Sequence, residues 1–121
     1  MKKIFCLYRG NSMEEIEAQK MACYIYAKLQ GWTISKEFSE INDVYENKTD
    51  SLQVIHDAVL NGELDTLLVY EFNNLSKDDI EIPLAVSWFV ENGIDIVSVK
   101  YEKRDFEKEK ILIINNSEKN I

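Results

Sequence analysis

The chain alternates between short apolar runs and longer segments with helical spacing, and this alternation restricts it to few folds. Apolar runs of strand length occupy residues 3–8, 32–38, 65–72 and 94–99. Apolar residues recur at helical spacing over residues 13–31, 50–63 and 75–93. Such alternation predicts an α/β fold, with an open, mostly parallel sheet of four or five strands and helices on both faces.

Local sequence signals set the expected ends of the helices. Ser12 followed by Glu15, and Ser76 followed by Asp79, fit a capping box, in which each side chain satisfies a backbone donor of the first turn. Pro83 lacks a backbone donor and predicts either a bend or a late start of the third helix. Glycines at positions 31, 62 and 93 are expected to end the three helices.

The last twenty residues depart from the alternation. Residues 102–110 form a mixed charge run, which is typical of a solvated surface. The apolar stretch from Ile111 to Ile114 predicts a possible edge strand, and the polar tail after it is expected to be frayed. We expect residues 1–121 to form a single domain with no DNA-binding domain. No signal peptide or membrane span is recognisable, so we expect a cytoplasmic protein without a membrane partner.

Composition bears on the possible partners. The chain has 22 acidic and 14 basic residues, a formal net charge of −8, which repels polyphosphates unless the basic groups cluster. Charge alone therefore disfavours DNA. Cys6 and Cys23 have the pattern of small buried hydrophobic residues rather than of a disulfide or a metal pair.

No motif in the sequence predicts a cofactor or a metal. The lone histidine, His56, lies within a predicted helix, where packing or exposure to solvent explains it better than acid–base catalysis. The acids Glu40, Asp43 and Glu46 follow the second strand and fit a solvated loop better than a metal site. In a parallel sheet, ligands bind beyond the carboxyl ends of the strands, here residues 8–12, 39–43, 71–77 and 100 onward.

The residues at the ends of the first and third strands match the motifs of a known protein family in part. The stretch "MKKIFCLYRGNS", Gln19 in the first helix and the later "YEFNNLSKDD" resemble, over residues 1 to about 100, the catalytic domain of the serine recombinases of the resolvase/invertase family. That family opens with Tyr-x-Arg-x-Ser at the end of its first strand and has Asp-Arg-Leu-x-Arg after its third. The resemblance implies a serine that attacks a DNA phosphodiester to form a phosphoserine link. Arginines stabilise the transition state and no metal is needed.

Two registers relate the first loop to the family motif. In the register that we prefer, Arg9 matches the family arginine, Leu7 replaces the tyrosine, and Asn11 stands where the nucleophilic serine belongs. An amide cannot attack phosphorus. We prefer this register because it keeps the in/out alternation of the strand.

A shift of the register by one residue gives a different match. Tyr8 and Ser12 then fall on the tyrosine and serine positions, but Gly10 takes the arginine position and Arg9 is displaced. Neither register restores all three residues. Ser12 also fits the cap of the first helix, which we consider its main role.

The second motif is degenerate as well. Asn73 and Asn74 replace the Asp-Arg pair, and Lys77 replaces the second arginine. By the resemblance, Gln19 is retained and Asp43 takes the place of the family's serine or acid after the second strand, although a glutamine on a helix also has an ordinary surface explanation. Losses in the transition-state cluster cost about a hundredfold or more in rate each, which argues against strand cleavage.

Three functions remain open on the sequence alone. The first is a catalytically silent recombinase-like domain that binds or regulates, as a homo-oligomer or with a related recombinase of the same mobile element. The second is an active strand-exchange domain with Ser12 as nucleophile and Arg9 and Lys77 as a phosphate clamp. The third is a flavodoxin-like domain that shares only the fold with the recombinases.

Overall fold

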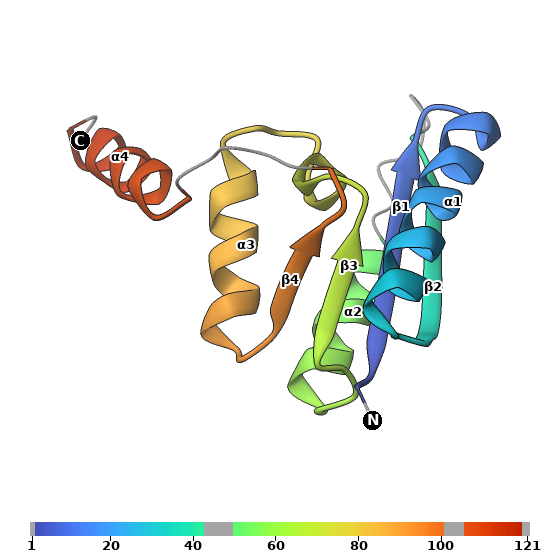
Figure 1. Cartoon of the computed structure of the whole chain (residues 1–121). Helices are drawn as coiled ribbons and strands as arrows, with labels where there is room; N and C mark the ends of the chain where they lie inside the picture. Colours follow the sequence, from blue (N-terminus) through green and yellow to red (C-terminus); the bar gives the residue numbers. More distant parts are fainter. Residues whose placement is uncertain (1, 43–49, 101–105, 120–121) are drawn as a thin grey trace.

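The computed structural model describes residues 2–42, 50–100 and 106–119 (Figure 1). Strands and helices alternate along the chain, as predicted for an α/β fold. The elements are β1 (Ile4–Gly10), α1 (Met13–Gln30), β2 (Ile34–Ile41), α2 (Asp50–Leu60), β3 (Thr66–Val69), the 3-10 turn η1 (Phe72–Leu75), α3 (Glu81–Glu91), β4 (Asp95–Ser98) and α4 (Phe106–Lys119).

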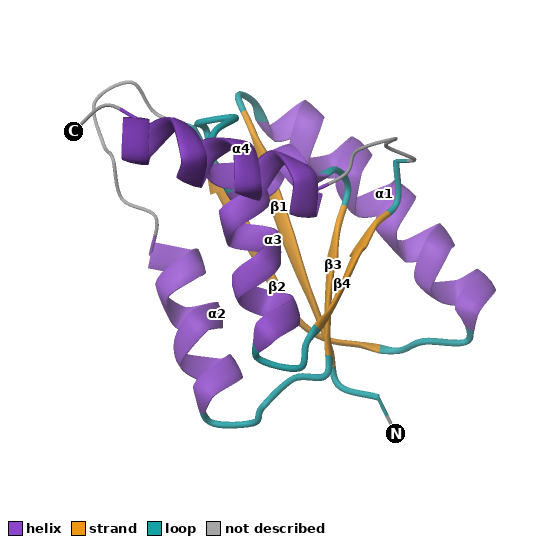
Figure 2. Cartoon of the chain, turned by 90° about the vertical axis from the view of Figure 1, so that its left-hand side faces the viewer, coloured by secondary structure: helices purple, strands orange, loops and turns teal. Residues whose placement is uncertain are grey.

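The four strands form one sheet in the order β2-β1-β3-β4, and every neighbouring pair is parallel. Figure 2 shows α1 on one side of this sheet and α2 and α3 on the other. Strand β2 lies on one side of β1 and β3 on the other, so the direction of strand addition reverses at β1. The carboxyl ends of β1 and β3 therefore form a topological switch point, which is where open α/β sheets bind ligands.

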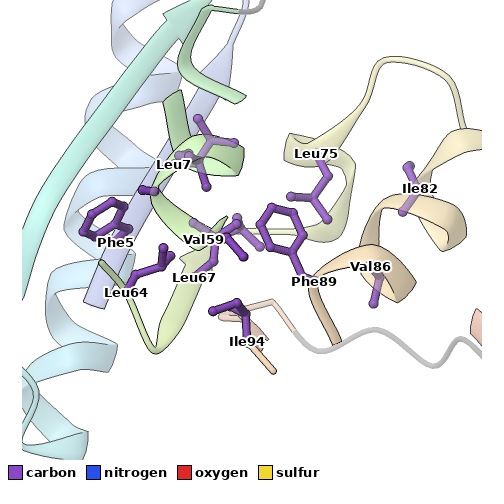
Figure 3. Close-up of a cluster of buried hydrophobic side chains, with 13 residues drawn as sticks. Phe5, Leu7, Val59, Leu64, Leu67, Leu75, Ile82, Val86, Phe89 and Ile94 are labelled. Atoms are coloured by element: carbon purple, nitrogen blue, oxygen red, sulfur yellow. The ribbon is translucent and has the colours of Figure 1, made fainter. Parts of the chain in front are cut away.

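The larger hydrophobic core lies between the sheet and helices α2 and α3 (Figure 3). Alternation along β1 directs Phe5 and Leu7 into this core, where they meet Leu67 and Val69 of β3. Phe89 of α3 is fully buried at its centre. Both long helices on this face thus owe their position to one continuous apolar cluster.

The smaller core lies under α1 and receives the other face of β1. It consists of Ile4, Cys6, Tyr8, Ile16, Cys23, Ala27 and Leu68. Both cysteines are free and fully buried, as predicted. Burial raises the pKa of the Cys6 and Cys23 thiols to about 12, so neither is a thiolate at neutral pH.

His56 packs rather than serving a catalytic site. Its ring lies 4.2 Å from that of Trp88 and 5.4 Å from that of Phe89, measured between centroids. Burial against these rings lowers the pKa of His56, because it disfavours the charged form. The imidazole is therefore a neutral packing group between α2 and α3 at neutral pH.

The two predicted capping boxes have different outcomes. Ser12 caps α1 as predicted, its hydroxyl accepting from the Glu15 amide at 3.2 Å. The Ser76–Asp79 box was wrong: α3 starts later, at Glu81, and Ser76 instead donates to the Glu81 carboxylate at 2.9 Å. Pro83 explains the late start, because a proline is tolerated only in the first turn of a helix.

The predicted edge strand at residues 111–114 was wrong, because these residues belong to α4. The polar tail that was expected to be frayed belongs to α4 as far as Lys119, and residues 120–121 lie outside the described residues. Helix α4 packs against α3, and Lys110 holds it there with bonds of 2.8 Å to both Ser87 and Glu91. A four-residue apolar run has no periodicity that separates strand from helix. Within the described residues, no helix is long and apolar enough to cross a membrane.

Candidate functional site

An open polar cavity of about 330 Å³ lies at the switch point of the sheet. It is bounded by the end of β1, the start of α1 and the segment that follows β3. Its lining residues are Arg9, Gly10, Asn11, Glu15, Gln19, Asn42, Glu71, Asn73, Asn74, Ser76, Lys77 and Asp79. Six of the eight residues that the sequence singled out line this one cavity, namely Arg9, Asn11, Gln19, Asn73, Asn74 and Lys77.

Arg9 is the buried cation of the site. It lies at the end of β1, is only 6% exposed, and shares the face of Leu7 on the strand. Its Nη2 donates to the Glu40 carboxylate at 2.9 Å, and its Nη1 donates to the Asn74 carbonyl at a longer 3.4 Å. The guanidinium charge is therefore already neutralised by a carboxylate of the neighbouring strand.

Gln19 and Asn74 join the end of β1 to η1. The Gln19 carbonyl oxygen accepts from the Arg9 amide at 3.0 Å and from the Asn74 side-chain amide at 3.1 Å. The Gln19 amide donates to the Arg9 carbonyl at 2.8 Å, and Asn74 also donates to the Leu7 carbonyl at 3.3 Å. Both side chains are buried, so Gln19 is no ordinary surface residue, and the two hold the backbone around Arg9 in place.

Asn11 and Ser12 differ in their relation to the cavity. Asn11 lines it, and its side-chain oxygen accepts from Asn42 at 3.2 Å. Ser12 does not belong to the cavity lining within the described part of the chain, and its hydroxyl is engaged as the cap of α1. The Glu15 carboxylate completes the turn by accepting from the Asn11 amide at 2.7 Å.

Gly10 is required by the close approach of Glu15. A Cβ at this position would lie 2.8 Å from the Glu15 carboxylate and 2.9 Å from the Glu15 Cβ. Any side chain here would force the start of α1 to shift. The shifted register assigns the family arginine to position 10, where a side chain would require Glu15 and the start of α1 to move.

The second predicted cluster lies in the segment that follows β3, which forms another wall of the cavity. Asn73 and Lys77 are exposed, and Lys77 makes no ion pair with any other described residue. Glu71 on the same wall is paired with Lys100 at 3.4 Å. Asp43, the remaining predicted site residue, lies outside the described residues, so its place in the site stays a prediction.

Glu40 is the residue of this site that sequence reasoning missed. The second strand was predicted to end at residue 38, but β2 continues to Ile41 and pairs Glu40 directly with Arg9 of β1. An acid two residues beyond the last apolar residue of a predicted strand was the only signal in the sequence. Extension of the strand turns this acid from a loop residue into the partner of the buried arginine.

The arrangement limits the chemistry that the cavity can perform. No group of three or more metal-ligating side chains occurs among the described residues. The described lining offers amides, the ammonium of Lys77 and several carboxylates. Since the Ser12 hydroxyl caps α1 and Asn11 lines the cavity, the loop after β1 presents an amide to the cavity rather than the Ser12 hydroxyl.

Removal of the Ser12 hydroxyl tests its structural role. We expect Ser12→Ala to lower the free energy of unfolding by about 1 kcal/mol, because an amide of the first turn loses its acceptor. Ser12→Asp should retain the cap and lose much less. Chemical denaturation measures both, with Ser39→Ala as the control, because Ser39 is exposed on β2. Equal losses for Ser12→Ala and Ser39→Ala would contradict the capping role.

Solved structures share this fold. A resolvase family site-specific recombinase from Streptococcus pneumoniae superposes with a TM-score of 0.71 at 14% identity, covering 98% of this chain and 89% of the other. The N-terminal catalytic domain of TP901-1 integrase gives 0.68 at 24% identity, with 98% and 94% covered. The C-terminal catalytic domain of ISC1926 TnpA, an IS607-like serine recombinase, gives 0.68 at 18% identity, with 94% and 79% covered.

Comparison of sequences assigns the family. No curated protein sequence matches the chain significantly. The family model described as "Resolvase, N terminal domain" matches residues 10–116, which is most of the chain. This match includes the loop after β1, η1 and most of α4. This match argues against the flavodoxin-like alternative. The chain belongs to the resolvase N-terminal domain family, the DNA-recombination family of the serine recombinases.

Proposed function

We propose that this resolvase domain is catalytically silent and acts as a binding or regulatory protein in DNA recombination. The observation that carries the proposal is the position of Ser12. Its hydroxyl accepts from the Glu15 amide at the start of α1, outside the cavity that Arg9 and Lys77 line. A nucleophile of a phosphoryl transfer must lie against the groups that stabilise the transition state, and this hydroxyl does not.

The cationic groups support the same proposal. A phosphoryl transition state needs fixed donors with uncompensated charge. Arg9 is paired with Glu40 at 2.9 Å, and the second-motif positions carry Asn73 and Asn74, which are neutral. Lys77 supplies a point charge rather than the planar fork of an arginine. The loss of several such groups removes most of the rate that the family's chemistry requires.

We propose another copy of this chain, or a related recombinase, as the partner. Exposed apolar residues on α4 support an interface, since Ile111, Leu112 and Ile114 are 54%, 52% and 44% exposed. Sedimentation over a wide range of protein concentration should show self-association. A monomer at every concentration would leave only the related recombinase as a partner.

The alternative is an active strand-exchange domain that uses Ser12 with Arg9 and Lys77 as a clamp. One observation favours it, namely that Arg9 and Lys77 line the same cavity as Asn11, the residue next to Ser12. DNA affinity measured against salt separates the two. A phosphate clamp releases counterions, so log K falls with log salt by about 0.9 for each phosphate neutralised. We expect a slope near zero for this acidic chain, and a slope steeper than about −2 would favour the alternative.

A further inference from the structure

We propose that the outer face of α1 binds the same face of a second copy of this chain, with the two helices antiparallel. The outer face is the side of α1 that is turned away from the sheet, and the residues that matter on it are Glu14, Glu17, Met21, Ile25, Lys28 and Leu29. This face lies on a different element from α4 and outside the polar cavity at the switch point. The inference therefore goes beyond the proposed function.

Apolar side chains form a stripe along the outer face. Met21, Ile25 and Leu29 follow one another at intervals of four residues, so they lie side by side on the surface of the helix. They are 64%, 55% and 79% exposed. Single exposed apolar residues are ordinary on a protein surface, but a contiguous stripe marks an interaction site.

The inner face of α1 is already buried. Ile16, Cys23 and Ala27 on that face are 1%, 0% and 2% exposed. Helix α1 packs against β1 and β2, and among the described helices it alone covers its side of the sheet (Figure 2). A helix that is apolar on opposite faces is usually covered on both. The described part of the chain covers one face, so a second molecule is needed to cover the other.

The charges of the outer face indicate which molecule that is. The first half of the helix carries Glu14 and Glu17, and its last turn carries Lys28. None of these three residues makes an ion pair with another described residue. Two copies in parallel would place like charges side by side, whereas an antiparallel pair brings the acidic half of each helix against Lys28 of the other. The face is thus complementary to itself.

A two-fold axis at the level of residue 23 satisfies both the stripe and the charges. Residues at equal distances from such an axis oppose each other, so Met21 of each copy meets Ile25 of the other. Glu17 then lies within one residue of Lys28 of the second copy. Because 18 residues of helix span only about 27 Å, the interface is small, and we expect a dissociation constant of about 10–100 μM.

The test measures self-association by sedimentation in a chain that carries Leu112→Glu, so that the exposed apolar residues of α4 do not mask the result. We expect this chain to dimerise and Ile25→Glu to weaken the dimer at least about thirtyfold. The control is Val54→Glu, which makes the same change at a residue of α2 that is 50% exposed, and it should leave the association unchanged. All three changed positions are exposed, so the variants should fold.

Charge exchange tests the antiparallel arrangement. In the same background, Glu17→Lys and Lys28→Glu each bring like charges together and should each weaken the dimer about tenfold. An equimolar mixture of the two variants should associate again, because every contact between positions 17 and 28 then joins opposite charges. Glu17→Lys also reduces the net negative charge of the chain, so a general charge effect would strengthen the association instead.

A chain with Leu112→Glu that stays monomeric well above the expected dissociation constant would overturn the inference. So would equal effects of Ile25→Glu and Val54→Glu, or no recovery in the mixture of charge variants. A monomer that binds a related recombinase through Ile25 would assign the face to another partner and would also overturn it. Failure of the proposed function appears instead as covalent attachment of DNA to the natural chain, which sedimentation of these variants does not measure.

Discussion

Arg9→Met is expected to lower the free energy of unfolding by about 3 kcal/mol, because it leaves the Glu40 carboxylate without its cation inside the protein. Removal of one partner of a buried ion pair lowers the free energy of unfolding by far more than the intact pair raises it, because the other charge is left buried and unpaired. Among the described residues, Glu40 then retains the Ser51 amide as its donor, and the Asn74 carbonyl loses its charged donor. Urea denaturation followed by tryptophan fluorescence measures the change.

Loss of an exposed lysine shows how much of the Arg9→Met effect comes from the burial of the ion pair rather than from the loss of a positive charge. Lys100→Met breaks the exposed pair between Lys100 and Glu71, where the lysine side chain is 57% exposed. Solvent screens that pair, so we expect a loss below about 1 kcal/mol. If Arg9→Met cost no more than this control, the Arg9–Glu40 contact would not be the buried ion pair that the structure describes.

Phe89→Ala should have an effect of similar or greater size. The side chain is fully buried in the core between the sheet and α3 (Figure 3). Its ring also contacts those of His56 and Trp88. Truncation leaves a cavity in a well-packed layer, so we expect a loss of about 3–5 kcal/mol. Denaturation curves with an unchanged slope would assign the loss to the folded state.

The neighbouring residue provides the comparison for Phe89. Val90 follows it on α3 but is 58% exposed, so Val90→Ala should change the stability by no more than about 0.5 kcal/mol. A small effect of Phe89→Ala, similar to that of Val90→Ala, would mean that α3 does not pack on the sheet as described. The position of Asn73, Asn74 and Lys77 at the cavity would then lose its support.

The sequence predicted the elements whose patterns are unambiguous. β1 and β3 are apolar on both faces, which is typical of central parallel strands, and α1 carries both a capping residue and a terminal glycine. The run at residues 111–114 lacks such signals. These residues belong to α4, which packs against α3. Because α3 precedes β4 in the chain, no local sequence pattern around residues 111–114 predicts this contact.

Part of the site could be predicted, because parallel strands gather their carboxyl ends at one edge. This rule places Arg9, Ser12, Asn74 and Lys77 together. Arg9, Asn74 and Lys77 do line the cavity, whereas Ser12 caps α1 outside the lining. The rule could not show that the Gln19 side chain is buried or that Glu40 faces Arg9. The burial of Gln19 depends on how α1 docks against β1 and η1. The Arg9–Glu40 pairing depends on the length of β2 and on the strand register, and a shift of one residue would turn Glu40 to the other face of the sheet.

The site therefore combines the resolvase fold with departures from the family motifs at Asn11, Asn73 and Asn74. Gln19 and Asn74 hold the end of β1 tightly around Arg9, as a binding site requires. The hydroxyl and the free guanidinium groups that phosphoryl transfer needs are engaged elsewhere or replaced. Under the proposed function, such a domain binds another recombinase subunit and does not cut DNA.

The most direct test of catalytic silence is a search for a covalent bond between Ser12 and DNA. The purified chain is incubated with supercoiled plasmid that carries the DNA flanking its own gene, and the products are analysed by denaturing electrophoresis and intact-protein mass, with Ser12→Ala in parallel. We predict uncut plasmid and unmodified protein in both samples. A nucleotide adduct on the natural chain that is absent from Ser12→Ala would contradict the account and establish the domain as an active recombinase.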